Sequence, residues 1–147
     1  MTSQPPKVYP AHQPEPSGAQ DLVGYDIDLD DPAGGAVVRL RVEARHLNRN
    51  GTLQGGIQAM LLDAAAGFSA SRFLAGDDPT VTPVVTLSLT SNFLAPALMG
   101  DVIATGQVTG GGHKIVYASA EIRDGDGKLL SHGNGVFKRT ALKRMEG

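Results

Sequence analysis

Cysteine is absent from this 147-residue chain, and only four histidines are present. Without cysteine the chain can form neither disulfides nor thiolate metal sites, and a reducing compartment is weakly favoured. The histidines are scattered, and no His-x-x-x-His pair falls on a predicted helix. Zinc is usually held by such a pair, so we expect no metal and no resident cofactor.

The chain also lacks a strong charge bias and a long hydrophobic run. Its formal net charge is -2 and it contains no block of basic residues, so we expect no nucleic-acid partner. No segment reaches the roughly 18 consecutive apolar residues of a membrane span, and the N-terminus has no apolar core of the signal-peptide kind. We therefore expect a soluble, cytoplasmic protein without a membrane partner.

The length and composition predict one domain. The chain is 41% hydrophobic, which is enough for a single core but not for two. Five of the nine prolines lie within the first sixteen residues, so residues 1–20 are expected to form a flexible arm. The domain is then expected over residues 21–140, followed by a C-terminal tail over residues 141–147.

Hydrophobic periodicity predicts an α+β fold. Alternation of apolar and polar residues from Gly35 to Ala44 is typical of a half-buried strand, and a shorter strand is expected within 22–29. Residues 56–73 form an apolar helical run. Later strands are expected over 84–94, 101–109, 114–123 and 128–137, joined by a break at Pro96 and Gly100, by "GGGH" and by "DGDG". Three hairpin-type links predict an antiparallel meander, with the helix packed against it.

One carboxylate, Asp63, lies within the apolar helical run. A helical wheel places Ile57, Met60, Leu61, Ala64 and Phe68 on one face, and Asp63 within a strip of small residues, Ala59, Ala66, Gly67 and Ala70. The helix is therefore expected to be buried on all sides. A buried carboxylate needs hydrogen-bond partners or a shifted pKa, so Asp63 is either an interface hydrogen-bonder or a functional acid.

The glycine pair Gly55 and Gly56 precedes this helix. Such glycines often serve only turn geometry or packing. Here they open a helix, whose first amides lack internal partners and can hold a developing negative oxygen. Gly55 and Asp63 are eight residues apart, or about 12 Å along a helix, so one carbonyl cannot touch both within one chain. If both act on one group, Asp63 comes from a second chain with an antiparallel helix, and the strip of small residues suits that approach.

The segment "HLNRNGTLQGG" followed by "IQAMLLDAAAG" resembles the hotdog-fold acyl-CoA thioesterases of the phenylacetate-pathway and 4-hydroxybenzoyl-CoA type. The resemblance covers about residues 35–138. It implies a long central helix wrapped by a five- to six-stranded antiparallel sheet, an acyl-CoA substrate, and a homodimer that pairs into a dimer of dimers. Residues that match the family pattern in identity and spacing are His46, Asn48, Gly51, Gly55, Gly56, Leu61 and Asp63.

The resemblance also implies roles for individual residues. Asp63 corresponds to the acid that attacks the thioester or activates water, and the Gly55 amide to the oxyanion donor, with Gly56 beside the substrate. Asn48 matches a residue that positions the water or the acid, and Thr86 falls where relatives often carry Ser or Thr near the nucleophile. Gln54 stands where relatives usually have His, and its amide side chain hydrogen-bonds but cannot take up a proton.

Two further groups have competing interpretations. His113 and Lys114 follow three glycines and are either an exposed hairpin, the interpretation we favour, or a contact for the phosphates of the coenzyme A nucleotide. His46 ends a predicted strand, where a structural hydrogen-bonding role is favoured over a role as base.

Three functions are compatible with the sequence. The first is hydrolysis of aryl or short- to medium-chain acyl-CoA thioesters. The second is a non-catalytic acyl-CoA-binding module, for which the loss of the motif histidine would be tolerable. The third, a hydratase or dehydratase, is ranked last because no histidine lies on the helix to act as base. Asp63 favours the enzyme, since a binding module gains nothing from a buried acid beside a thioester.

Overall fold

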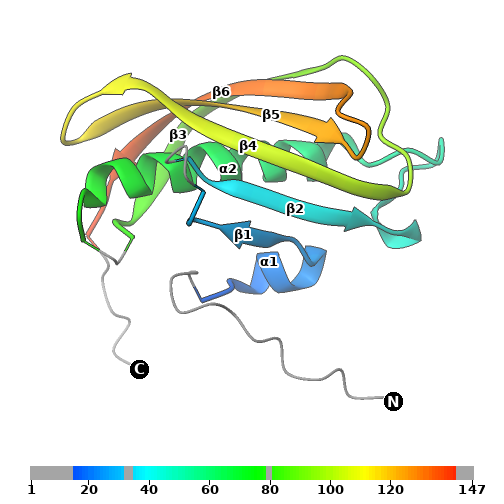
Figure 1. Cartoon of the computed structure of the whole chain (residues 1–147), viewed down its shortest axis with the longest axis horizontal. Coiled ribbons are helices and arrows are strands. Elements are labelled where there is room, and N and C mark those ends of the chain that lie inside the picture. The colour runs from blue at the N-terminus through cyan, green and yellow to red at the C-terminus, as the bar shows by residue number, and fades with distance from the viewer. Residues whose placement is uncertain (1–14, 32–34, 79–80, 142–147) are drawn as a thin grey trace.

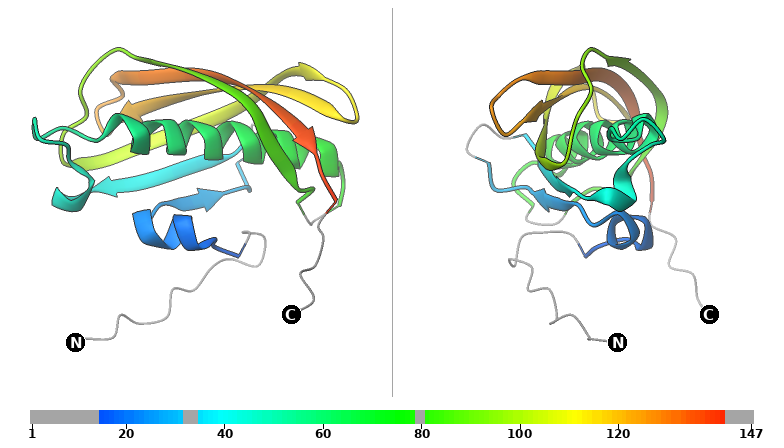
Figure 2. Two further views of the ribbon diagram at one scale, coloured as in Figure 1. Left: turned by 180° about the vertical axis from the view of Figure 1, so that it is seen from behind. Right: turned by 90° about the vertical axis from the view of Figure 1, so that its right-hand side faces the viewer.

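The computed structural model describes residues 15–31, 35–78 and 81–141, and places one long helix against a six-stranded antiparallel sheet (Figure 1). The elements are α1 (Gly18–Val23), β1 (Asp26–Asp28), β2 (Val37–Val42), a 3-10 turn (Ala44–His46), α2 (Gly55–Ala75), β3 (Val84–Phe93), β4 (Gly100–Gly111), β5 (Ile115–Asp124) and β6 (Leu129–Arg139). The sheet curls around α2 (Figure 2). The expected α+β hotdog fold is therefore confirmed.

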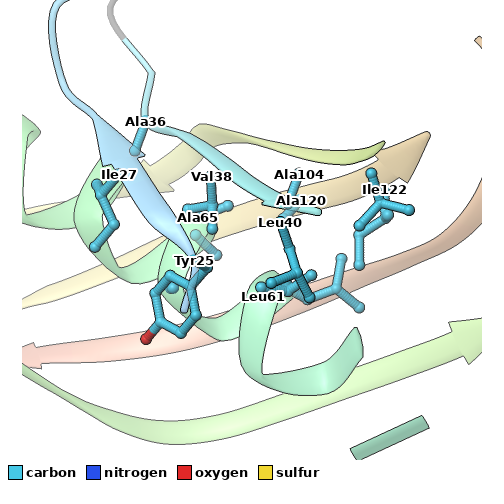
Figure 3. Close-up of a cluster of buried hydrophobic side chains, with 14 of the residues drawn as sticks. Tyr25, Ile27, Ala36, Val38, Leu40, Leu61, Ala65, Ala104, Ala120 and Ile122 are labelled. Carbon is cyan, nitrogen blue, oxygen red and sulfur yellow. The ribbon is translucent and has the colours of Figure 1, made fainter. Parts of the chain in front are cut away.

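The core lies between α2 and the concave face of the sheet. In β2, Val38 and Leu40 are buried while the intervening Arg39 is exposed, as the alternating pattern predicts. Figure 3 shows Leu61 and Ala65 of α2 among side chains from β2, β4 and β5. Each Å² of apolar surface that these contacts remove from water stabilises the fold by about 25 cal/mol. This burial is the main contribution that holds the helix against the sheet.

The order of the strands is β1-β2-β4-β5-β6-β3. The hairpin links from β4 to β5 and from β5 to β6 are as predicted. The predicted hairpin between the strands at 84–94 and 101–109 is wrong, because β3 pairs with β6 while β4 pairs with β2. The six-residue pairing of β2, from Val37–Thr105 to Val42–Gly100, fills the edge of β4 that β3 would need. Consequently β3 is the outer strand on the far side of the sheet.

The strip of small residues on α2 packs inside its own chain. Ala66 and Ala70 are buried, and a Cβ added to Gly67 would lie 3.2 Å from the Phe137 ring on β6. The small residues therefore allow the chain's own sheet to pack closely against α2. Their interpretation as a surface for a second helix is wrong. The helix is also not buried on all sides, since Gly56, Ala59, Met60 and Asp63 form a partly exposed stripe at helical spacing.

Helix α2 and strand β4 meet at their backbones. A Cβ added to Gly106 of β4 would lie 2.1 Å from the carbonyl oxygen of Ala65 and 2.4 Å from Oγ of Ser69. Ser69 Oγ donates to the Ala65 carbonyl and accepts from the amide of Ala36, just before β2. Glycine is required at this crossing because no side chain fits between helix and strand.

The ends of the chain are only partly described. Residues 1–14 of the expected arm and 142–147 of the expected tail lie outside the described residues. Residues 18–20 belong to α1, capped by Ser17, rather than to an extended arm. Neither helix in the described ranges is long and apolar enough to cross a membrane.

Candidate functional site

The loop before α2 is organised by the side chain of Asn48. Its Oδ1 accepts hydrogen bonds from the amides of Asn50 and Thr52, at 2.9 and 3.1 Å, and its Nδ2 donates to Thr52 Oγ1. Such asparagine bonds close a local turn, and the amide of Leu53 then donates to the carbonyl of Ala97. Asn48 therefore shapes the approach to α2, and within this chain it makes no hydrogen bond to Asp63.

His46 anchors the other side of this loop. Its Nδ1 accepts from the amide of Glu43 at 2.9 Å, so Nε2 carries the proton and donates to the carbonyl of Val23 at 2.7 Å. Its own carbonyl accepts from the amide of Gln54. The ring is buried with both nitrogens used, so the predicted structural role of His46 is confirmed.

Helix α2 begins with two free backbone donors. Gln54 is the N-cap residue, and its carbonyl accepts from the amides of Ile57 and Gln58. The exposed side chain of Gln54 makes no capping hydrogen bond. Among the described residues, no acceptor reaches the amides of Gly55 or Gly56. These two N–H groups therefore stand at the positive end of a 21-residue helix, ready for an anionic oxygen.

Asp63 is partly exposed and is held by Thr86. The Thr86 hydroxyl donates to Asp63 Oδ1 at 2.6 Å, which brings together two residues that the sequence placed 23 positions apart. The register of β3 against β6 shifts between Thr86 and Ser88, an irregularity of the kind often found beside active sites. Oδ2 of Asp63 has no hydrogen bond within the described ranges, so one carboxylate oxygen is oriented and the other is available.

Tyr25 is a second titratable group near the acid. Burial, and to a lesser degree the negative charge of Asp63, raise the pKa of the Tyr25 hydroxyl. The residue lies between α1 and β1, and its hydroxyl points away from the labelled apolar side chains (Figure 3). Tyr25 could not be predicted from the sequence, because a lone aromatic residue before a short strand carries no local signal of a distant carboxylate.

The free amides and the acid lie at separate places along α2. A surface pocket of about 320 Å³ surrounds the helix start, and Asp63 does not line it. Residues that line this pocket are Asn48, Thr52, Leu53, Gly55, Gln58, Phe93, Leu94, Ala95 and Pro96. Strand β3 passes both places, since Thr86 bonds Asp63 and the Phe93 ring is 3.9 Å from a Cβ added to Gly55. The expected separation of acid and amides within one chain is thus present.

The other predicted contacts lie at the opposite end of α2. His113 and Lys114 are exposed in the turn between β4 and β5, beside the end of α2 that is remote from Gly55 (Figure 1). A larger pocket of about 820 Å³ also lies toward this end, lined by Arg72 and Phe73 among others, and by none of the predicted site residues. A coenzyme A contact at His113 and Lys114 stays a prediction.

Known proteins resemble the chain in both sequence and structure. The thioesterase superfamily matches residues 50–131. Acyl-coenzyme A thioesterase 13 of Homo sapiens is 30% identical over 110 residues, covering 73% of this chain and 75% of that protein. The conserved protein PA5202 of Pseudomonas aeruginosa aligns with a TM-score of 0.74 and 30% identity, over 89% of this chain and 100% of that chain. The E. coli PaaI protein from the phenylacetic acid degradation operon aligns with a TM-score of 0.73 and 26% identity, over 85% of this chain and 86% of that chain.

Proposed function

The chain belongs to the thioesterase superfamily and is a thioester hydrolase, and on that premise we propose that it hydrolyses acyl-CoA thioesters with Asp63 as nucleophile or general base. The observation that carries this proposal is the pair Thr86–Asp63, in which one carboxylate oxygen accepts a hydrogen bond at 2.6 Å and the other has no hydrogen bond to any described residue. A fixed carboxylate with a free oxygen can attack a carbonyl carbon or take a proton from water. Human acyl-coenzyme A thioesterase 13 supports acyl-CoA as the substrate.

The amides of Gly55 and Gly56 supply the second half of the chemistry. As water or Asp63 adds to the thioester carbon, the carbonyl oxygen becomes negative, and the free N–H groups at the helix start stabilise that charge. The carbon–sulfur bond then breaks, and coenzyme A leaves as a thiolate that takes up a proton. When Asp63 acts as nucleophile, water cleaves the resulting anhydride. The reaction needs no resident cofactor, because water is the second reactant.

The two halves meet when a second copy of the chain pairs with the first along β3. Strand β3 is ten residues long and lies at the edge of the sheet, yet Val85, Leu87 and Phe93 are 45%, 54% and 52% exposed. A long apolar edge strand is a site for pairing with another strand. This edge, rather than the strip of small residues, supports the dimer.

Antiparallel pairing of the two β3 strands places the catalytic groups together. Thr86 lies beside Asp63, and Phe93 lies beside Gly55. If Thr86 lies opposite the partner's Phe93, the two-fold axis brings Asp63 of each chain toward the helix start of the other. The exposed turn at His113 and Lys114 remains a candidate contact for the phosphates of coenzyme A. A pair of such dimers would form the proposed tetramer.

Gln54 takes the place of the family histidine beside these amides. Its exposed side chain makes no capping bond, so it is available to donate a hydrogen bond to the thioester carbonyl. We assign it this orienting role, together with Asn48, whose turn holds the helix start in place.

The test is thiol release from aryl, short-chain and medium-chain acyl-CoAs by the parent and by Asp63→Asn. The substitution keeps the volume and removes the charge, so we expect it to fold, dimerise and bind substrate while turnover falls by about 100-fold or more. A parent that binds acyl-CoA but releases no thiol would instead support the binding module. Equal activity of parent and variant would remove Asp63 from the mechanism, and a monomer at micromolar concentration in light scattering would refute the shared site.

A further inference from the structure

Gln58 lies in the second turn of α2 and is buried with an unpaired polar atom. Only 4% of the residue is exposed, and its Oε1 has no hydrogen-bond partner within the described residues. A buried amide oxygen without a partner costs folding free energy, and an apolar side chain of the same shape would avoid that cost. The position of this glutamine therefore calls for a partner that the described part of the chain does not supply.

Gln58 is one of the residues that line the pocket at the helix start. Gln58 follows Gly55 by three residues, about 4.5 Å along the helix axis. Side chains on a helix lean toward its N-terminus, so the amide of Gln58 lies over the turn that carries the free N–H groups. The pocket of about 320 Å³ is thus lined by Gly55 at the helix start, by Gln58, whose side chain carries the unpaired and covered Oε1, and by an apolar wall that includes Phe93 and Pro96.

Gln58 lies about 4.5 Å along the helix axis from Gly55. Its unpaired acceptor therefore favours a ligand that carries a hydrogen-bond donor close to its thioester. A purely apolar acyl group would fill the pocket and leave the amide oxygen unpaired, whereas a hydroxyl or N–H group would satisfy it. Sites of this kind discriminate strongly, because the ligand without the donor leaves a buried polar group unsatisfied.

We propose that Gln58 is a specificity residue whose Oε1 accepts a hydrogen bond from a donor three to four bonds from the thioester carbonyl carbon. The inference rests on the proposed function, because it takes the thioester to lie at the Gly55 and Gly56 amides. Two parts of a substrate carry such a donor: a hydroxyl on the third carbon of the acyl group, and the first amide N–H of the pantetheine arm. Both satisfy the glutamine by the same chemistry.

The experiment compares matched substrates with the parent and with Gln58→Met, which keeps the length of the side chain and removes the amide. The first pair is butyryl-CoA and 3-hydroxybutyryl-CoA, and the second is the N-acetylcysteamine and S-propyl thioesters of butyrate. If the acyl hydroxyl is the donor, the parent favours 3-hydroxybutyryl-CoA by about 10- to 100-fold in kcat/KM, and Gln58→Met loses that preference. If the pantetheine amide is the donor, the parent favours the N-acetylcysteamine thioester over the S-propyl thioester, and Gln58→Met loses that preference. Gln107→Met, on β4 outside this pocket, is the matched control and keeps the parent's selectivity.

Binding and stability complete the test. Dissociation constants for the two CoA esters are measured by calorimetry in the Asp63→Asn background with and without Gln58→Met. If the acyl hydroxyl is the donor, they follow the same preference without turnover; if the pantetheine amide is the donor, Gln58→Met weakens the binding of both esters equally. A preference in binding with an inactive parent would support the role of Gln58 and refute the proposed hydrolysis alone. Gln58→Met is expected to unfold at a urea concentration equal to or higher than the parent's. Unchanged selectivity in both pairs, no binding of either ester, or a clearly less stable variant would overturn the inference.

Discussion

Replacing Gly55 with proline would remove one backbone N–H while keeping the start of α2 intact. Proline suits the first position of a helix, and it requires an extended residue before it. Gln54 already has φ of -55° and ψ of 130°, and the nearest heavy atom to a Cβ at Gly55 is 3.9 Å away in the Phe93 ring. Gly55→Pro therefore tests the oxyanion donor rather than the fold, and we expect turnover to fall by about 100- to 1000-fold.

Mixing this variant with Asp63→Asn tests whether the two residues of one site come from different chains. Random exchange of the subunits makes about half of the dimers mixed, and by two-fold symmetry each mixed dimer has one site with both changes and one site with neither. The mixture should then regain about a quarter of the parent's activity, because one site in four is intact. Each variant alone should stay near or below about 1% of the parent.

The assay is thiol release after the two variants, carrying different affinity tags, are co-expressed; the unfractionated mixture should show about a quarter of the parent's activity, and the purified mixed dimers, in which one site in two is intact, about half. Gly55→Ala retains the amide and is the matched control, with activity close to the parent's. If Asp63 and Gly55 of the same chain formed the site, every site in the mixture would carry one change and no activity would return. Mixed dimers that form but remain inactive would therefore refute the antiparallel β3 arrangement.

Three other predictions follow from single contacts. Thr86→Val should lower turnover by about 10- to 100-fold through loss of the hydrogen bond to Asp63, while Thr86→Ser should retain activity; equal rates for Val and Ser would contradict this role. Gly106→Ala should destabilise the protein by about 3 kcal/mol in urea unfolding, because its Cβ would overlap the α2 backbone, whereas Gly112→Ala, with open space around it, should not. The pKa of Tyr25 is raised on folding, so its contribution to stability is complete below about pH 10 and is lost as pH rises, at no more than about 1.4 kcal/mol per pH unit. Urea unfolding between pH 9 and 11 should show this loss in the parent and a smaller one in Tyr25→Phe; identical pH dependence would contradict it.

Local periodicity predicted the elements of this fold, because burial alternates along a strand and repeats every turn along a helix. It identified α2 and the five longer strands to within a few residues, and the glycine-rich links identified the hairpins on both sides of β5. It did not predict the place of β3. A turn signal reports a change of direction between neighbours in sequence, whereas the pairing of β3 with β6 depends on which sheet edge β2 has already filled.

Residues of the candidate site could be predicted where the motif lies in one segment, and not where the fold brings segments together. Asp63 and the glycine pair were found from the helix alone, and Thr86 from its spacing in the family pattern. The helical wheel showed that Ala66 and Ala70 share a face, but not that their own sheet covers that face. Likewise, the sequence carries no signal that singles out Gln58, since only the packed structure reveals an amide oxygen without a partner among the described residues.

The crossing of α2 and β4 at Gly106 limits where a long acyl chain can run. At that level the space between the two backbones does not admit even a methyl group, and the pocket at the helix start lies on one side of it while the larger pocket lies on the other. The contact at Gly106 therefore separates the two pockets between helix and strand, so neither continues into the other along this path. An acyl chain that fills the pocket of about 320 Å³ therefore cannot continue between α2 and β4 of its own subunit, and additional carbons would have to leave the pocket by its open side.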